Sequence, residues 1–172
     1  KLIVFFSQPF SEQMDKDFNE VKIFSDIAEA IEEIYPEKEV IVKFHPKEEN
    51  HKKLDEIIKR SKLNIKIEEK LKADDLSRVA GLVVGINSMA LFDASLMQKN
   101  VLSYQPGKDN NSDSLVSNGY GWSVPIYKKE DLAIAIRDIY KKPKVKKELL
   151  KKYINNDSIK KVVSFINSKI NN

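Results

Sequence analysis

Short apolar runs alternate with amphipathic helical segments along most of this chain, and this alternation constrains the fold more than any other feature. Runs of strand length lie at 2–6, 40–44, 64–68, 81–85, 101–104 and 122–126. Between them, hydrophobic residues recur at helical spacing within 18–34, 54–58, 76–79, 88–98 and 130–140. Such alternation favours parallel strands joined by right-handed crossovers. The sequence therefore predicts an α/β fold, a Rossmann-like three-layer α/β/α domain with a mainly parallel sheet of about six strands.

Polar residues mark where several of these helices are expected to begin. Asp15 or Asp17 is a suitable N-cap for the helix that starts near Phe18, and the Asp74-Asp75 pair suits the short helix after it in the chain. The stretch 105–118 is rich in Gly, Asn, Asp and Ser, which predicts a long loop. Two more helices are expected at 145–153 and 158–170.

Length and composition limit what the chain can be. Its 172 residues, 41% of them hydrophobic, suffice for one compact domain with a core but not for two large ones. It has no cysteine, so disulfides and thiolate zinc sites are excluded. No apolar run approaches the ~18 residues of a membrane span, and we expect a cytoplasmic protein. The first residue is Lys1 rather than methionine, which suggests a piece of a longer protein.

The charge is divided unevenly between the body and the C-terminus. Residues 141–172 hold ten lysines against two acidic residues, a net charge of +8, whereas residues 1–140 carry −4. We therefore expect a domain at 1–140 and a basic helical tail at 141–172 that packs on the same domain. The tail is either a solvated helix face or a contact for an anionic membrane surface. With only three arginines in the chain, sequence-specific nucleic-acid binding is not expected.

His45 ends the second apolar run, and Pro46 stops the strand there. At the carboxyl end of a parallel sheet, where ligands bind, an imidazole whose Nδ1 is held by backbone can donate Nε2–H to a phosphate oxygen. The alternative is a loop histidine with no function. His51 lies in a charged segment and is expected at the surface.

The fourth run ends at Gly85 and leads through Asn87 and Ser88 into a helix. Glycine permits a tight turn or a close backbone approach, and Asn or Ser caps a helix well. The helix N-terminus then favours an anion, although a capped helix without a ligand remains an equal alternative. Asp93, one turn further on, can accept hydrogen bonds from ribose hydroxyls or simply complement the start of the helix.

Polar loops also follow the first and fifth runs, where Ser7 and Gln8, and then Gln105, stand just past the strand ends. Several well-known motifs are missing: no Gly-Lys-Ser/Thr follows a glycine-rich loop, no Gly-x-Gly-x-x-Gly follows the first strand, and Ser88 lacks the glycines of a nucleophile elbow. The acidic pairs at 68–69 and 74–75 have no histidine at metal-ligand spacing, so capping or surface roles are expected and no metal site is predicted.

Taken together, four motifs resemble the C-terminal, donor-nucleotide-binding half of GT-B glycosyltransferases. They are Ser7-Gln8-Pro9, His45-Pro46, Asn87-Ser88 and Ser103-Tyr104-Gln105-Pro106, and each follows a predicted strand. The branch with His-Pro and Ser motifs is the most similar, and it contains bacterial sialyltransferases, polysialyltransferases and, more remotely, CDP-glycerol glycerophosphotransferases. The resemblance covers about residues 1–140.

The resemblance implies a nucleotide-sugar site without a metal or cofactor. His45, preceding Pro46, would contact the donor phosphate and assist departure of the nucleotide, and Asn87 and Ser88 would bind the phosphate. Glu68 would lie near the base and Asp93 near the ribose. The remaining expected substrate-binding positions come from the same strand ends: Ser7, Gln8, Gly85 and Gln105.

The resemblance also implies that a nucleotide-sugar is the substrate and that the acceptor site and the general base belong to an N-terminal domain absent from this chain. The isolated chain is then expected to bind donor weakly and not to turn over. A CMP-linked sugar is preferred, with CDP- and UDP-linked sugars as alternatives. A nucleotide-sugar 2-epimerase is a second possibility, although Asn87-Ser88 replaces the Gly-Gly turn of that group. A non-catalytic Rossmann-like binding module is the third.

Overall fold

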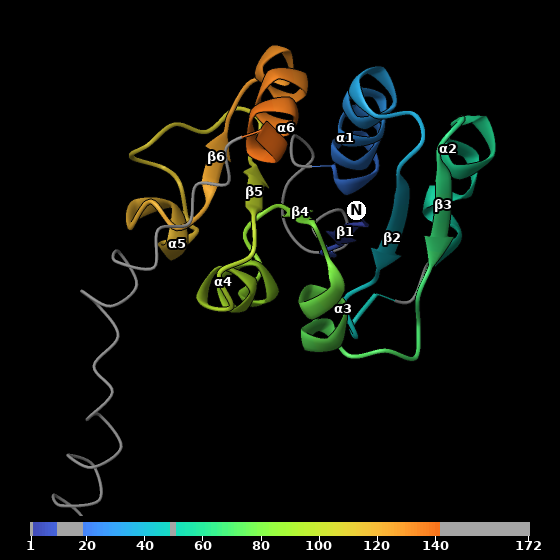
Figure 1. Cartoon of the computed structure of the whole chain (residues 1–172), viewed down its shortest axis with the longest axis horizontal. Helices are drawn as coiled ribbons and strands as arrows, with labels where there is room; N and C mark the ends of the chain where they lie inside the picture. The colour runs from blue at the N-terminus through green and yellow to red at the C-terminus, as the bar shows by residue number, and fades with distance from the viewer. Residues whose placement is uncertain (1, 10–18, 49–50, 142–172) are drawn as a thin grey trace, which may run out of the picture.

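The computed structural model describes residues 2–9, 19–48 and 51–141, and within them it contains a six-stranded sheet (Figure 1). All five strand pairs are parallel, in the order β3-β2-β1-β4-β5-β6. The predicted Rossmann-like α/β/α architecture is therefore confirmed. The strands are β1 (Ile3–Phe6), β2 (Glu39–Lys43), β3 (Asn64–Ile67), β4 (Leu82–Gly85), β5 (Val101–Tyr104) and β6 (Val124–Ile126).

Helices cover both faces of this sheet (Figure 1). One face packs against α1, α2 and α6, and the other against α3 and α4. A 3-10 turn at His51–Leu54 precedes α2, another at Lys129–Asp131 precedes α6, and a one-turn helix, α5, lies in the connection from β5 to β6. The α-helices are α1 (Glu20–Ile34), α2 (Asp55–Arg60), α3 (Ala73–Val79), α4 (Met89–Leu96), α5 (Val116–Gly119) and α6 (Leu132–Lys141).

The core has two halves because successive strand residues point to opposite faces of the sheet. In β1, Ile3 and Phe5 join the cluster under α1, where the Phe5 ring lies 4.9 Å from that of Phe24. Val4 and Phe6 join the cluster on the opposite face. All four side chains are buried, as a central parallel strand requires.

Three predicted details of local structure were wrong: the N-caps of two helices and the extent of one loop. Asn19, not Asp15 or Asp17, caps α1, since its Oδ1 accepts hydrogen bonds from the backbone N–H groups of residues 21 and 22. Lys72 occupies the N-cap position of α3, and Asp74-Asp75 lie in its first turn, where they face the positive helix end. The loop expected at 105–118 contains the first three residues of α5. Asp15, Asp17 and the tail helices expected at 145–153 and 158–170 lie outside the described residues.

The order of the strands decides where a ligand can bind. The chain runs outward from β1 to β2 and β3, then returns to the other side of β1 with β4. This reversal opens a crevice at the carboxyl ends of β1, β2 and β4, the position at which open α/β sheets hold ligands. None of the helices in the described part of the chain is both long and apolar enough to cross a membrane.

Candidate functional site

A pocket of about 680 Å³ opens at this reversal. Its wall comes from the loops after β1, β2, β3 and β4 and from the first residues of α3 and α4. The lining set is Phe6, Ser7, Gln8, Lys43, Phe44, His45, Pro46, Lys70, Leu71, Lys72, Ala73, Asn87, Ser88, Met89 and Ala90. Six of the ten predicted site residues are in this set: Ser7, Gln8, His45, Pro46, Asn87 and Ser88.

The imidazole of His45 is held in one orientation by its own turn. The backbone N–H of Lys47 donates to His45 Nδ1 at 3.1 Å, and the backbone N–H of Glu48 donates to the His45 carbonyl at 2.9 Å. Because Nδ1 accepts a hydrogen bond, the neutral ring carries its proton on Nε2. His45 therefore carries its hydrogen-bond donor on Nε2, and the residue lies in the pocket lining.

Ser88 occupies the N-cap position of α4, but its side chain makes no capping hydrogen bond. Its Oγ is buried and has no hydrogen-bond partner among the described residues. The first turn of α4 also leaves backbone N–H groups unpaired within the helix, as every α-helix N-terminus does. Ser88 and a positive helix end thus lie together at one wall of the pocket, and a positive helix end is suited to an anion.

Gly85 lies beneath this wall rather than in it. A Cβ built on Gly85 would lie 2.8 Å from Leu91 Cδ1 and 2.9 Å from the carbonyl oxygen of Phe6. The glycine is therefore required by the close approach of α4 to β1, one of the two roles expected for it.

Asn87 is engaged with its neighbours. Gln8 Nε2 donates to Asn87 Oδ1 at 3.0 Å, and the backbone N–H of Asn87 donates to Gln8 Oε1 at 2.9 Å. Asn87 Nδ2 donates to Ser114 Oγ, which in turn donates to Gln105 Oε1 at 3.3 Å. These contacts form a polar chain, Gln8–Asn87–Ser114–Gln105, that ties together the loops after β1, β4 and β5.

The other predicted residues lie outside the pocket lining. Gln105 is buried and donates to Ser103 and Asp113. Glu68 Oε1 accepts from the backbone N–H groups of Lys70 and Leu71, at 2.7 and 2.9 Å, so it shapes the loop that lines the pocket. These hydrogen bonds, that from Leu71 first, lower the pKa of Glu68.

Asp93 also lies outside the lining, one turn further along α4. Burial raises the pKa of its carboxyl group, and the negative charge of Asp74 on the neighbouring helix α3 raises it further. The side chain is thus half-buried beside a like charge, at a place where a hydroxyl donor would stabilise the carboxylate.

The cationic part of the pocket was not predicted from the sequence. Lys43, Lys70 and Lys72 line it, and none of the other lining residues that the structure describes is an Asp or a Glu. Lys43 Nζ donates to the Glu69 carbonyl at 2.7 Å, which holds the loop after β3 against β2. The place of Lys43, two residues before His45, indicated a positive charge near the strand end. Lys70 and Lys72 have no sequence feature that distinguishes them from solvent-exposed lysines. In the described part of the chain, no three His, Cys, Asp or Glu side chains come together as a metal site.

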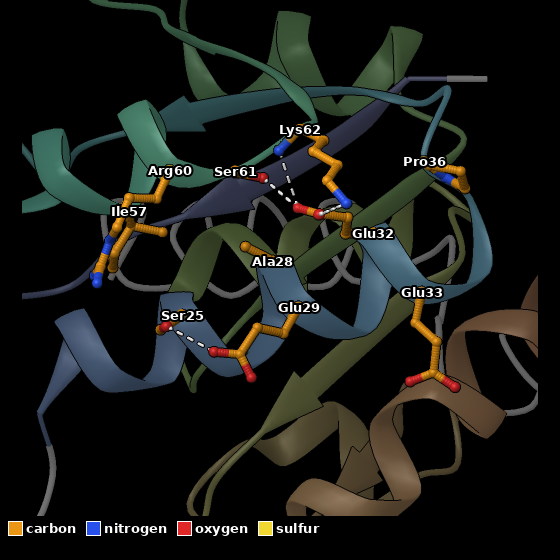
Figure 2. A pocket seen from close by; sticks show the side chains of 10 residues that line it. All are labelled: Ser25, Ala28, Glu29, Glu32, Glu33, Pro36, Ile57, Arg60, Ser61 and Lys62. Atoms are coloured by element: carbon orange, nitrogen blue, oxygen red, sulfur yellow. Dashed lines mark hydrogen bonds and ion pairs between the residues drawn. The ribbon is translucent and has the colours of Figure 1, made fainter.

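A second cavity, of about 710 Å³, lies between α1 and α2 (Figure 2). None of the predicted residues lines it. Two of its three carboxylates have partners: Glu32 accepts from Ser61 Oγ at 2.9 Å and from the backbone of Lys62 at 3.0 Å, and Glu29 accepts from Ser25 (Figure 2). Its described lining contains neither a histidine nor a helix N-terminus, so the pocket at the strand ends is the candidate functional site.

Several solved structures share this fold. The UDP-GlcNAc 2-epimerase from Methanocaldococcus jannaschii matches with a TM-score of 0.64 and 18% identity, over 97% of this chain and 45% of that one. The UDP-GlcNAc 2-epimerase from Neisseria meningitidis bound to UDP-GlcNAc matches with a TM-score of 0.64 and 12% identity, over 98% of this chain and 45% of that one. The pneumococcal O-GlcNAc transferase GtfA in complex with UDP and GlcNAc matches with a TM-score of 0.60 and 11% identity, over 99% of this chain and 36% of that one. The chain thus spans less than half the length of these proteins.

The described part of the chain therefore shares the Rossmann-like fold of the matched part of these proteins. A search of curated protein sequences finds no match. The family model for alpha-2,8-polysialyltransferase (POLYST), however, matches residues 1–101, more than half of the chain. The protein belongs to that family, and the predicted resemblance is confirmed.

Proposed function

We propose that this domain binds the nucleotide of a nucleotide-sugar and serves as the donor half of a glycosyltransferase. The observation that carries the proposal is the meeting of His45, Ser88 and the N-terminus of α4 in one pocket, in a member of the polysialyltransferase family. All three features supply hydrogen-bond donors, and a phosphate needs donors. The lysines at positions 43, 70 and 72 add positive charge, and no carboxylate competes with them among the described lining residues.

The two sides of the pocket suit the two parts of a nucleotide. The phosphate would contact His45 Nε2–H, Ser88 Oγ–H and the first N–H groups of α4. Apolar side chains, among them Leu71 and Met89, would lie against the nucleoside, because small-molecule sites are lined mainly by apolar side chains. Glu68 would act near the base by holding its loop, and Asp93 would accept from ribose hydroxyls. Ser7, Gln8, Asn87 and Gln105 would support the loops that form the wall.

In the transfer step, the bond between the anomeric carbon and the phosphate oxygen breaks, and its electron pair goes to the phosphate. The acceptor hydroxyl oxygen forms the new bond to that carbon and gives its proton to a base. His45 would stabilise the charge that grows on the departing phosphate, which is electrostatic catalysis and requires no metal. Among the lining residues that the structure describes, none is a carboxylate that could act as the base, so we assign the acceptor site and the base to an N-terminal domain and expect the isolated chain to be inactive.

A CMP-linked sugar is the preferred donor in this proposal, in line with the family, and CDP- and UDP-linked sugars are the alternatives. The test is a titration of the ¹⁵N-labelled chain with CMP, CDP and UDP, followed by amide shifts in NMR spectra. We expect shifts at His45, Ser88 and Met89, largest with CMP. If no nucleotide shifts these amides, the proposal is wrong.

The basic tail at 141–172 would carry the domain to an anionic membrane surface, because ten lysines in one segment favour such a surface. Sedimentation with vesicles that contain anionic lipid, compared with neutral vesicles, tests this part. Binding to neither vesicle would exclude the membrane contact and leave the tail as a packing segment of the domain.

A nucleotide-sugar 2-epimerase is the second candidate, favoured by the fold shared with two epimerases. The Asn87-Ser88 pair disfavours an epimerase, because a Gly-Gly turn is typical of that group at this position. Incubation of the chain with UDP-GlcNAc and detection of the C2 epimer would decide. Nucleotide binding without epimerisation favours the transferase, and binding of no nucleotide favours a Rossmann-like module without catalytic function.

A further inference from the structure

A cluster of buried charges lies behind the His45 turn. Lys53 Nζ contacts Glu20 Oε1 at 2.5 Å and Glu48 Oε1 at 2.6 Å, and the side chains of both glutamates are fully buried. Glu20 belongs to the first turn of α1, and Lys53 to the 3-10 turn before α2. Burial lowers the pKa of Lys53, but hydrogen bonds to the two carboxylates raise it more, so the group stays charged. This charge makes burial of the carboxylates tolerable.

Glu48 has a second set of contacts, directed at the site. Its Oε2 accepts from the backbone N–H of His45 at 2.5 Å, and its Oε1 accepts from Ser7 Oγ at 2.8 Å. The backbone N–H of Glu48 also closes the turn on the His45 carbonyl. One carboxylate therefore connects the strand end that carries His45 to the strand end of β1, while Lys53 links it to α1.

The turn that Glu48 closes is the one that fixes the imidazole. Lys47, whose backbone N–H donates to His45 Nδ1, lies between Pro46 and Glu48. If the Glu48 carboxylate is removed, two of the three hydrogen bonds that define the turn remain, but the His45 backbone loses its acceptor and the turn loses its attachment to β1. The remaining hydrogen bond from Lys47 N–H to Nδ1 then lies in a less restrained turn, so it opens more readily and the ring can also take the other tautomer.

We propose that Glu48 is a positioning residue for His45, one that holds the ring with Nε2–H available to a phosphate. The functional unit is thus the four-residue turn from His45 to Glu48 rather than the His-Pro pair alone. Glu48 is not in the pocket lining and is 4% exposed, so it acts through His45 rather than on a ligand. The ligand part of this inference rests on the proposed nucleotide function, whereas the tautomer part stands on the turn itself.

The test compares Glu48→Ala with Glu20→Ala. Each variant removes the same side chain from a buried position and leaves Lys53 with one carboxylate, but only the first touches His45. Both are made with His51→Asn, so that the chain carries one imidazole, and long-range ¹H–¹⁵N spectra are recorded at a pH where the ring is neutral. We expect the Nε2–H tautomer alone in the parent and in Glu20→Ala, and both tautomers in Glu48→Ala.

A conservative variant separates positioning from charge. In Glu48→Gln the amide oxygen can still accept from the His45 backbone, so we expect the parent tautomer to return although the negative charge is gone. If Glu48→Ala does not fold, Glu48→Asp replaces it, because the shorter side chain cannot reach both His45 and Lys53, and mixed tautomers are again expected. A single unchanged tautomer in every folded Glu48 variant would overturn the proposal.

Calorimetric titration with CMP adds the functional readout. We expect about tenfold weaker binding to Glu48→Ala than to Glu20→Ala, since a hydrogen bond to a charged phosphate contributes about 1.5 kcal/mol and 1.4 kcal/mol corresponds to a factor of ten. Equal affinities for the two variants would contradict the positioning role. Failure of the parent chain to bind any nucleotide would overturn the proposed function but not the tautomer result.

Discussion

Replacement of Gly85 by alanine should loosen the contact between α4 and β1 on which the pocket depends. The new methyl group would lie 2.8 Å from Leu91 Cδ1 and 2.9 Å from the Phe6 carbonyl oxygen. Leu91 is fully buried, so its side chain has little room to withdraw. Phe6 belongs to β1, which is paired with β2 and β4, so its carbonyl is held in place.

The magnitude follows from those two contacts. Overpacking a buried site by one methyl group costs about 1–3 kcal/mol. Since one of the two clashing atoms is fixed backbone, we expect about 2 kcal/mol, which lowers the melting temperature of a domain of this size by roughly 4–8 °C. If relief comes from an outward shift of α4, Ser88 moves with it, and nucleotide affinity should fall as well.

Chemical denaturation followed by circular dichroism measures the loss, with Gly119→Ala as the matched control. A Cβ at Gly119 meets no atom within 4 Å, so that variant should match or slightly exceed the parent in stability. Leu91→Val removes the nearer of the two clashing atoms and should recover part of the loss in the double variant. A Gly85→Ala chain within about 0.5 kcal/mol of the parent, or full recovery by Leu91→Val, would refute the reasoning.

Three further outcomes can be checked. Ser88→Ala should leave the free energy of unfolding within about 0.5 kcal/mol of the parent, because its buried Oγ has no described partner, yet weaken CMP binding about tenfold by calorimetry. Asn87→Ala should cost about 1–2 kcal/mol in urea unfolding, because it removes side-chain bonds to Gln8 and Ser114; an unchanged midpoint would contradict this. Burial raises the pKa of Asp113, but hydrogen bonds, Tyr127's first among them, lower it more. Its contribution to stability is therefore complete above the unfolded pKa of about 3.9 and lost as pH falls through the lower folded pKa, so Asp113→Asn should flatten the stability curve there.

The sheet could be predicted from the sequence because its strands are buried on both faces. Runs such as Ile3–Phe6 and Leu82–Gly85 are continuously apolar, and segments whose hydrophobic residues recur at helical spacing separate them. The connection rules then leave few topologies, and the carboxyl ends of β1, β2 and β4 meet where His45 and Ser88 were expected to meet.

The missed features are those in which one residue type serves several purposes. Asn19, Asp15 and Asp17 are all good N-caps, and only the position at which the helix begins selects among them. In the sequence, Glu48 cannot be distinguished from the other charged residues of its lysine-rich segment. Its burial depends on Lys53, which also contacts Glu20, 28 residues before Glu48. Spacing alone does not reveal such a partnership, since the three side chains meet only after α1 and the turn before α2 have packed on the sheet.

The polar chain Gln8–Asn87–Ser114–Gln105 has a consequence for anyone who wishes to change the sugar or nucleotide that the domain accepts. Gln8 lies on the loop after β1, Asn87 on the loop after β4, and Ser114 and Gln105 on the loop after β5, so side-chain hydrogen bonds join these three loops. A single loop grafted from a relative would arrive without its partners and leave the partly buried amides of Gln8 and Asn87 without the hydrogen bonds they make now. Successful redesign therefore requires all three loops to be exchanged together, with the sheet beneath them kept unchanged.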